Sequence, residues 1–195
     1  MKITYYGHSC FTLESQGFRI VVDPYRDYVP GYKKLDLEAD AAYCSHGHDD
    51  HCWVQDVTMR ESGAEDPFTI TEIAGFHDDV RGAKRGPNMM RIFEAEGLRV
   101  AHLGDIGCLP PEGDLEKLKD LDACLVPVGG FYTIDAKQAA AIAADIRPRM
   151  VIPMHYRTET TGYDVIADID DVMPAFGDEL NVVTLTYGGY AVVEK

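Results

Sequence analysis

One short segment of the chain concentrates side chains that bind metals. His46, His48, Asp50 and His51 form a His-x-His-x-Asp-His pattern, which this composition would produce by chance in about one sequence in a thousand. Alternate histidines of an extended loop point to one side, and the next Asp-His pair can turn to a neighbouring position. One segment can therefore supply ligands to two metal ions, and imidazole and carboxylate groups suit zinc, manganese or iron. The structural alternative is a His- and Asp-rich surface turn without a metal.

Three further candidate ligands come shortly after predicted strands. His77 follows a strand over residues 68–76, Asp105 follows one over 98–103, and His155 follows one over 150–153. An isolated loop histidine or Gly-Asp turn is usually solvated, but two adjacent divalent ions need more ligands than one segment offers. Strand carboxyl ends are where α/β proteins build their sites. We therefore expect these residues to join the histidine loop.

The elements that position these residues belong to the α/β class. The first half predicts strands over residues 1–6, 10–14, 19–23, 41–44, 68–76, 89–95 and 98–103, with a hairpin turn at 96–97. After residue 104, strands over 124–127, 150–153, 182–185 and 190–193 alternate with helices. One helix is expected over residues 114–121, capped by Asp114. A second begins at a capping box of Asp135 and Gln138 and ends before Pro148, and a third spans residues 169–176. Such alternation predicts sheets covered by helices.

Length and charge limit the function classes. The chain has 195 residues, with 18 basic and 33 acidic side chains and a formal charge of −15. This length favours one domain spanning residues 1–195. The negative charge disfavours long nucleic acids and anionic membranes, because binding to both depends on cationic side chains. The first residues lack the apolar stretch of a secretory signal, and no run approaches the ~20 apolar residues of a membrane-spanning helix, so we expect a cytoplasmic protein. No feature indicates an oligomeric state.

The cysteines carry little signal. Five are present, at positions 10, 44, 52, 108 and 124, and no two form a Cys-x-x-Cys pair. An odd number at wide spacing predicts neither a disulfide framework nor a thiolate zinc site.

The metal-binding pattern also resembles a known signature. His46-x-His48-x-Asp50-His51, then His77, Gly104-Asp105 and His155, is similar to the signature of the metallo-β-lactamase fold superfamily. Further matches are Gly7-His8-Ser9-Cys10-Phe11, Asp23-Pro24, Phe76-His77-Asp78-Asp79, Arg85-Gly86-x-Asn88, Ala101-His102-Leu103-Gly104-Asp105, Pro127-Val128-Gly129-Gly130 and Ile152-Pro153-Met154-His155-Tyr156. Together, over residues 1 to about 157, they resemble small bacterial and archaeal metal-dependent hydrolases related to the ascorbate-6-phosphate lactonase branch.

The resemblance implies a four-layer αββα sandwich with two divalent metal ions at one edge, zinc being favoured over manganese or iron. It assigns His46, His48 and His77 to the first ion, Asp50, His51 and His155 to the second, and Asp105 to a bridge between them. Asp23 would orient a ligand loop. The segment 52–76 is shorter than usual in this family, so a helix that normally helps to wall the cleft is expected to be short or absent.

The resemblance implies hydrolysis but not a substrate. We expect a lactonase-like enzyme that cleaves an ester, lactone or phosphoester bond of a small metabolite through metal-bound hydroxide, with Asp50 as a candidate proton acceptor. His51 and Asp105 stand where many true β-lactamases carry other residues, and His48 replaces a carboxylate of flavodiiron proteins. Two alternatives remain open: a phosphodiesterase or nuclease acting on short nucleotides, and a non-catalytic binding module stabilised by metal.

Substrate contacts are expected in one basic loop over residues 77–88. Arg81, Lys84 and Arg85, with Arg157 beside His155, are candidates to receive an anionic group. Asn88 and Tyr132 are candidate further contacts. The alternative is a solvated loop whose cations pair with nearby carboxylates.

Proton transfer is expected from His8, whose Gly-His-Ser turn can face the cleft. A buried, hydrogen-bonded histidine is the other interpretation of His8. Tyr132 and Tyr156 are weaker candidates for the same role. His102 lies within an apolar strand and is predicted to be structural.

Overall fold

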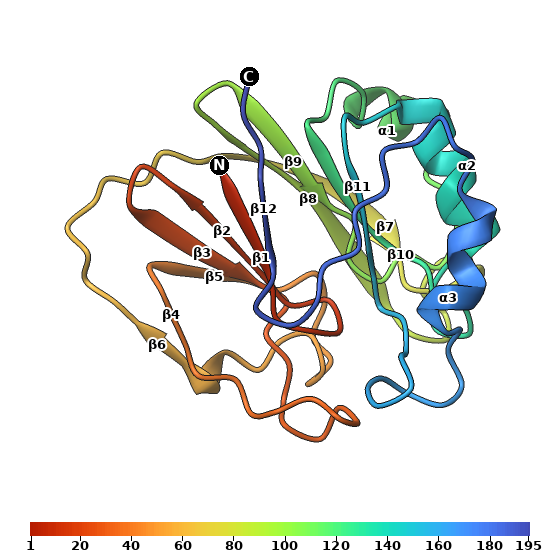
Figure 1. Cartoon of the computed structure of the whole chain (residues 1–195), viewed down its shortest axis with the longest axis horizontal. Helices are drawn as coiled ribbons and strands as arrows, with labels where there is room; N and C mark the ends of the chain where they lie inside the picture. Colours follow the sequence, from red (N-terminus) through yellow and green to blue (C-terminus); the bar gives the residue numbers. More distant parts are fainter.

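The computed structural model describes residues 1–195, which form two five-stranded sheets packed face to face (Figure 1). The first sheet has the order β12-β1-β2-β3-β5, and the second has the order β11-β10-β9-β8-β7. The first sheet consists of β1 (Lys2–Tyr5), β2 (Phe11–Ser15), β3 (Phe18–Val22), β5 (Ala41–Tyr43) and β12 (Tyr190–Val192). The second consists of β7 (Thr69–Phe76), β8 (Pro87–Ala95), β9 (Leu98–His102), β10 (Ala123–Pro127) and β11 (Val151–Met154).

Parallel pairing brings chemically active loops to one edge of the sandwich. In the first sheet, β3 pairs in parallel with β5, so the loops after Val22 and Tyr43 start side by side. In the second sheet, β9, β10 and β11 are parallel to one another. The segments after β9 and β11 therefore leave the sheet at the same edge, which explains why Asp105 and His155 approach each other from distant positions.

The core follows the period-two alternation of the strands. Ile20 and Val22 of β3 point into the main cluster of 38 buried residues, which joins both sheets. Val21 points to the opposite face and joins a smaller cluster that includes Tyr25 and Leu35. Strand β3 is thus anchored on both faces.

Three helices lie on the outer side of the second sheet (Figure 1): α1 (Glu112–Lys117), α2 (Ala136–Ile146) and α3 (Ile169–Val172). The predicted capping box of α2 is confirmed, because Asp135 accepts from the Gln138 backbone and Gln138 returns the bond. The helix ends at Arg147, whose left-handed φ of 46° turns the chain before Pro148. The predicted α/β class, with paired sheets and helices on an outer face, is confirmed.

The outer face of the first sheet is covered without an α-helix. The segment between β3 and β7 contains a two-stranded sheet of β4 (Leu37–Ala39) and β6 (Val57–Met59) and a 3-10 turn, η1 (Val54–Asp56). The expectation of a short or absent helix in residues 52–76 is therefore confirmed. Both small strands were missed by sequence patterns, because three residues show no clear alternation.

Three local predictions are wrong. The strand expected over 182–185 reduces to one bridge between Val182 and Val151, because the chain must cross to the first sheet to form β12. The helix expected over 169–176 is α3 followed by a 3-10 turn, η2 (Met173–Ala175), where Pro174 lacks the N–H of a continuing helix. Asp114 lies in the first turn of α1 rather than capping it. No helix in the protein has the length and apolar character needed to cross a bilayer.

Asp40, between the small and large sheets, provides a test of stability away from the candidate site. Burial would raise its pKa, but Arg60 and the Arg19 N–H hold the pKa at about 2. Asp40→Ala should cost about 1–3 kcal/mol of unfolding free energy, lowering the Tm by roughly 2–4 °C for each kcal/mol.

Because the folded pKa lies below the unfolded value, this contribution is complete above about pH 4 and disappears as the pH falls through about 2. Thermal unfolding should therefore give a lower Tm for Asp40→Ala than for the wild type at pH 7, and nearly equal Tm values for the two proteins at pH 2. Asp178→Ala, at an exposed carboxylate, is the matched control. Equal Tm values for Asp40→Ala and the control at pH 7 would contradict the prediction.

Candidate metal centre

The seven candidate metal ligands, separated by up to 109 positions in the chain, converge at one edge of the sandwich. Ring nitrogens of His46, His48 and His77 all lie within 4.8 Å of one another. His51 and His155 form a second such group, which also includes His8. The loop after β5 thus contributes to both groups, as alternate spacing predicts.

Asp105 lies between these histidines. Its Oδ2 is 3.1 Å from Nε2 of His51, 3.1 Å from Nε2 of His155 and 3.3 Å from Nε2 of His77. The preceding Gly104 has a φ of +57°, and a Cβ there would overlap Asn88 and Ser45. Glycine is therefore required for Asp105 to approach the histidines.

Asn88 positions Asp105. Its side-chain oxygen accepts from the Asp105 N–H at 2.8 Å, and its amide donates to the Leu103 carbonyl at 2.9 Å. The side chain is buried and both of its polar groups are engaged. Asn88 therefore holds the Asp105 turn, and its contact with substrate stays a prediction.

Asp23 orients the histidine loop. Its carboxylate accepts from the Ser45 N–H and hydroxyl, each at 2.6 Å, and from Nδ1 of His51 at 2.8 Å. Residue 23 is fully buried. Nδ1 of His51 is therefore engaged, and the other ring nitrogen, Nε2, is directed toward Asp105. Metal-ligating histidines are usually held in this way, with one ring nitrogen bonded to an outer partner and the other left for the metal.

His8 lies beneath Asp50 rather than in the cleft. It is fully buried, its Nε2 is 3.4 Å from Asp50 Oδ2, and burial lowers its pKa to about 4. His8 therefore matches the buried interpretation and does not line the cavity over the histidines, while its role in proton transfer stays a prediction. His102 is structural as predicted: Nε2–H donates to the Ser9 carbonyl, and Nδ1 accepts from the Gly104 N–H.

The backbone at the site is strained. His8, Asp23 and His155 have φ values of 55°, 51° and 54°, in the left-handed region that non-glycine residues rarely adopt. Such strain persists only where surrounding contacts overdetermine the conformation, and it concentrates at functional sites.

Unpaired buried nitrogens fit a divalent metal ion. The buried side-chain atoms without a hydrogen-bond partner are Ser9 Oγ, His8 Nδ1 and Nε2, His46 Nε2, His51 Nε2, His77 Nδ1, His155 Nδ1 and Asp105 Oδ1. Burying polar atoms without partners is costly, so their concentration at one place fits a site that binds a metal ion. Imidazole with carboxylate is the donor set of zinc and related ions.

Electrostatics separate the histidines. Burial lowers the pKa of His46 to about 3, and the neighbouring His51 adds to this fall. Burial also opposes the charged form of His51, but the carboxylates of Asp105 and Asp23 outweigh it and raise the pKa. A neutral His46 offers the free electron pair that a metal ion needs.

A cavity of about 320 Å³ opens onto these residues. It is lined by His48, Asp50, His77, Arg85, Asp105, Tyr132, His155 and Tyr163. The Arg85 guanidinium lies 5.4 Å from the centre of the Tyr132 ring, an attractive cation–π geometry. The cavity has the size of a small-molecule site.

Tyr163 is a cavity residue that the sequence patterns missed. Its hydroxyl points to Asp50 Oδ2 at 3.4 Å, and burial with the Asp50 charge raises its pKa, so it remains a neutral donor. It reaches the site because the Gly162 N–H bonds to the Pro30 carbonyl. No motif surrounds Tyr163, so only the loop contact reveals it.

Three predicted substrate cations lie elsewhere. Arg157 pairs with Asp168 at 2.9 Å, and Lys84 pairs with Asp79 at 3.1 Å. Arg81 lines a separate pocket beside Phe76. Among the four cations considered, Arg85 is the one that lines the cavity over the histidines. Tyr156 is also absent from this cavity, and its hydroxyl donates to the Leu185 carbonyl.

The expectation of no disulfide is wrong at one pair. Cys44 and Cys52 are joined across the ligand loop, with Cα atoms 5.2 Å apart. The N–H groups of His51 and Cys52 both donate to the His48 carbonyl, and this turn brings the two cysteines together. The disulfide encloses four candidate ligands in one short ring, and Cys10, Cys108 and Cys124 stay free.

The Cys44→Ser/Cys52→Ser double variant should be less stable by about 2–3 kcal/mol, because loop closure no longer restricts the unfolded chain. Urea unfolding of the oxidised protein measures this difference. Cys108→Ser, at a free thiol, is the control. An unchanged midpoint in the double variant would show that the ring does not stabilise the protein.

Comparisons with known proteins agree with this geometry. Residues 2–155 match the family model for the β-lactamase superfamily domain. A UPF0173 metal-dependent hydrolase of Ignicoccus hospitalis is 30% identical, covering 81% of this chain and 83% of that protein. A Thermotoga maritima structure, described as a Zn-dependent hydrolase of the metallo-β-lactamase superfamily, is 31% identical with a TM-score of 0.70, covering 94% of this chain and 97% of that one.

More distant structures share the fold alone. The isothiocyanate hydrolase from gut bacteria of Delia radicum is 11% identical with a TM-score of 0.74, and each chain is fully covered. The family match, the close relatives and the converging histidines and carboxylates lead to one conclusion: the chain belongs to the β-lactamase superfamily and is a metal-dependent hydrolase.

Proposed function

We propose that this hydrolase holds two divalent metal ions, zinc in the first instance and manganese or iron otherwise, and cleaves an ester, lactone or phosphoester bond of a small anionic metabolite. One observation carries the proposal: two groups of histidine nitrogens, most of them buried and unpaired, lie around the single carboxylate of Asp105. His46, His48 and His77 would hold one ion, Asp50, His51 and His155 the other, and Asp105 both. Bound divalent ions supply Lewis acidity and lower the pKa of water to about 7.

Asp50 is suited to binding rather than to acid catalysis. Burial would raise its pKa, but the contact with His8 and the charge of His51 lower it, so the carboxylate stays ionised. It faces the cavity and accepts from Tyr163. Tyr163, a neutral phenol at the same wall, can donate a hydrogen bond to a bound substrate.

Arg85 supports the choice of an anionic substrate. It lines the cavity, has no carboxylate partner and lies over the Tyr132 ring. A guanidinium in this setting can bind a carboxylate or phosphate in bidentate geometry. The cavity is too small for a long polyanion, and the net charge of −15 opposes one.

The metal content and the reaction class can be tested together. Elemental analysis of protein purified without added metal or chelator should give close to two equivalents per chain, and that metal is then used in a screen of lactones, esters and phosphoesters. Absence of metal that persists after reconstitution would overturn the proposal. Turnover of bis(p-nitrophenyl) phosphate far above that of carboxylic esters would instead favour the phosphodiesterase alternative.

Arg85→Ala should raise the KM for anionic esters about tenfold and leave the KM of a neutral ester unchanged, because the lost interaction serves only the charged group. Steady-state kinetics on a matched pair of esters measures both values. Lys84→Ala, which removes the adjacent cation, is the control. Equal effects of Arg85→Ala on the two esters would remove Arg85 from substrate selection.

A further inference from the structure

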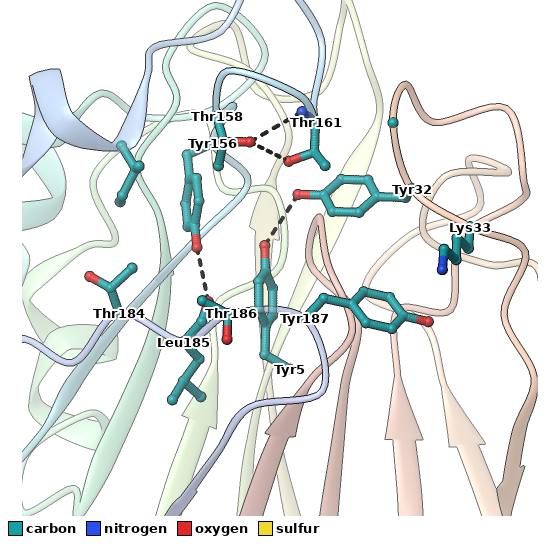
Figure 2. Close-up of a pocket in the computed structure, with 12 residues that line it drawn as sticks. Tyr5, Tyr32, Lys33, Tyr156, Thr158, Thr161, Thr184, Leu185, Thr186 and Tyr187 are labelled. Carbon is teal, nitrogen blue, oxygen red and sulfur yellow. Dashed lines mark hydrogen bonds between the residues drawn. The ribbon is translucent and has the colours of Figure 1, made fainter.

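A second cavity, of about 490 Å³, has Tyr156, the chain neighbour of His155, among its lining residues (Figure 2). We call it the tyrosine pocket. It is lined by Tyr5, Gly31, Tyr32, Lys33, Tyr156, Thr158, Thr161, Ile169, Thr184, Leu185, Thr186 and Tyr187. None of these residues lines the cavity over the histidines. Thr161 lines the tyrosine pocket and Tyr163 lines the cavity over the histidines, so the segment that carries both residues separates the two cavities.

The walls of the tyrosine pocket are aromatic, and two of its phenols are held firmly. Tyr5 and Tyr156 are each 3% exposed, with ring centres 6.2 Å apart. The Tyr5 hydroxyl donates to the His8 carbonyl, and the Tyr156 hydroxyl donates to the Leu185 carbonyl. Preformed aromatic walls favour a flat apolar ligand, since no side chain must be reordered on binding.

One phenol remains available to a ligand. The only polar neighbour of the Tyr32 hydroxyl is the Tyr5 hydroxyl, at 3.5 Å, which is the limit of a hydrogen bond (Figure 2). At the rim, Tyr187 is 48% exposed and Thr186 is exposed as well. The pocket thus offers a few polar groups at its mouth and apolar walls inside, as ligand sites do.

The charge of the tyrosine pocket differs from that of the whole protein. The chain has 33 acidic side chains, yet none is among the lining residues. Lys33 is the only charged lining residue and has no ion-pair partner, whereas the next residue, Lys34, pairs with Asp56 at 3.0 Å. An unpaired ammonium beside apolar walls favours an anionic group at one end of the ligand.

We propose that the tyrosine pocket is a second ligand site, which binds a small planar aromatic compound carrying one anionic group, such as an aromatic carboxylate. The ring system lies against the tyrosine side chains, and the anion reaches Lys33. This proposal does not depend on the substrate of the metal centre, because no residue lines both cavities.

The site adjoins the metal centre through the backbone. The His8 carbonyl accepts from both the Tyr5 hydroxyl and the His155 N–H, the latter at 2.8 Å. Tyr156 directly follows His155 in the chain. A ligand that lies against Tyr5 and Tyr156 therefore contacts residues next to the His8 turn.

Calorimetric titration of the metal-loaded protein with 2-naphthoate tests the proposal. We expect one site per chain with a Kd in the range of about 0.1–1 mM. Lys33→Gln should weaken binding about three- to fivefold and should leave the neutral analogue 2-naphthalenemethanol unaffected. Thr186→Trp, at the exposed rim, should fill the mouth and abolish saturable binding.

Two controls locate the bound probe. Lys34→Gln removes the neighbouring cation outside the pocket and should leave the affinity for 2-naphthoate unchanged. Arg85→Gln removes the cation over the metals and should also leave it unchanged. Binding that is lost in Arg85→Gln but kept in Lys33→Gln would place the probe at the metal centre and overturn the proposal, as would the absence of saturable binding. Neither result would bear on the hydrolytic activity, which is measured separately.

Discussion

Asp105→Asn should remove at least one metal equivalent per chain and lower hydrolysis by more than about a hundredfold, because changing even an outer partner of a ligand costs about 10- to 100-fold and Asp105 is itself a proposed ligand. The Asp105 carboxylate lies 3.1–3.3 Å from nitrogens of three histidines. Asparagine keeps the volume but lacks the negative charge that offsets two cations. The Asn88 and Gly104 contacts of the turn involve the backbone and remain, so the fold should be retained.

Elemental analysis, an ester hydrolysis assay and far-ultraviolet circular dichroism test this prediction on one preparation. Asp122→Asn is the matched control, because that carboxylate binds Arg149 and the Arg99 N–H away from the site. An Asp105→Asn protein that retains two metals and wild-type rates would rule out Asp105 as the bridge. Loss of structure in Asp105→Asn, in a protein whose wild type shows no hydrolysis, would support the binding-module alternative.

Asp23→Asn should lower metal affinity by about 10- to 100-fold while the protein stays folded. An amide oxygen can still accept from the Ser45 N–H, but the NH₂ group cannot accept from His51 Nδ1. The His51 ring then loses the acceptor that fixes its tautomer and directs Nε2 toward Asp105. The histidine loop should therefore keep its geometry, while the metal-binding electron pair of His51 Nε2 is no longer held in position.

Chelator competition measures the metal affinity in this variant. Ser45→Ala, which removes a single contact with Asp23, should have a smaller effect than Asp23→Asn. Activity of Asp23→Asn should recover at saturating metal, since Asp23 does not line the cavity. If Asp23→Asn binds metal as tightly as the wild type, Asp23 has no role in orienting His51.

Much of the candidate site follows from local sequence. His46, His48, Asp50 and His51 lie in one segment, and each remaining ligand follows a strand whose end is readable from its residues. Because parallel strands end at one edge, such residues are expected to meet. The convergence around Asp105 agrees with this reasoning.

Side-chain directions did not follow from local sequence. Arg81, Arg85 and Arg157 are similar in type and all lie near predicted ligands, yet only Arg85 lines the cavity. The difference arises from Asp168, which pairs with Arg157, and from the turn that carries Arg81 away. Such pairings depend on residues that are distant in the chain or on loop conformation, and no spacing rule encodes them.

The sequence by itself determined the chemistry of this protein: the donor types, their spacing and the strands that deliver them. The tertiary structure alone decided the Cys44–Cys52 pair, the approach of Tyr163 to Asp50 and the tyrosine pocket. The physical reason is that strand patterns depend on which residues face the core within a few positions. A disulfide, a cavity wall or an ion pair depends instead on distances between segments that only the packed sandwich brings together.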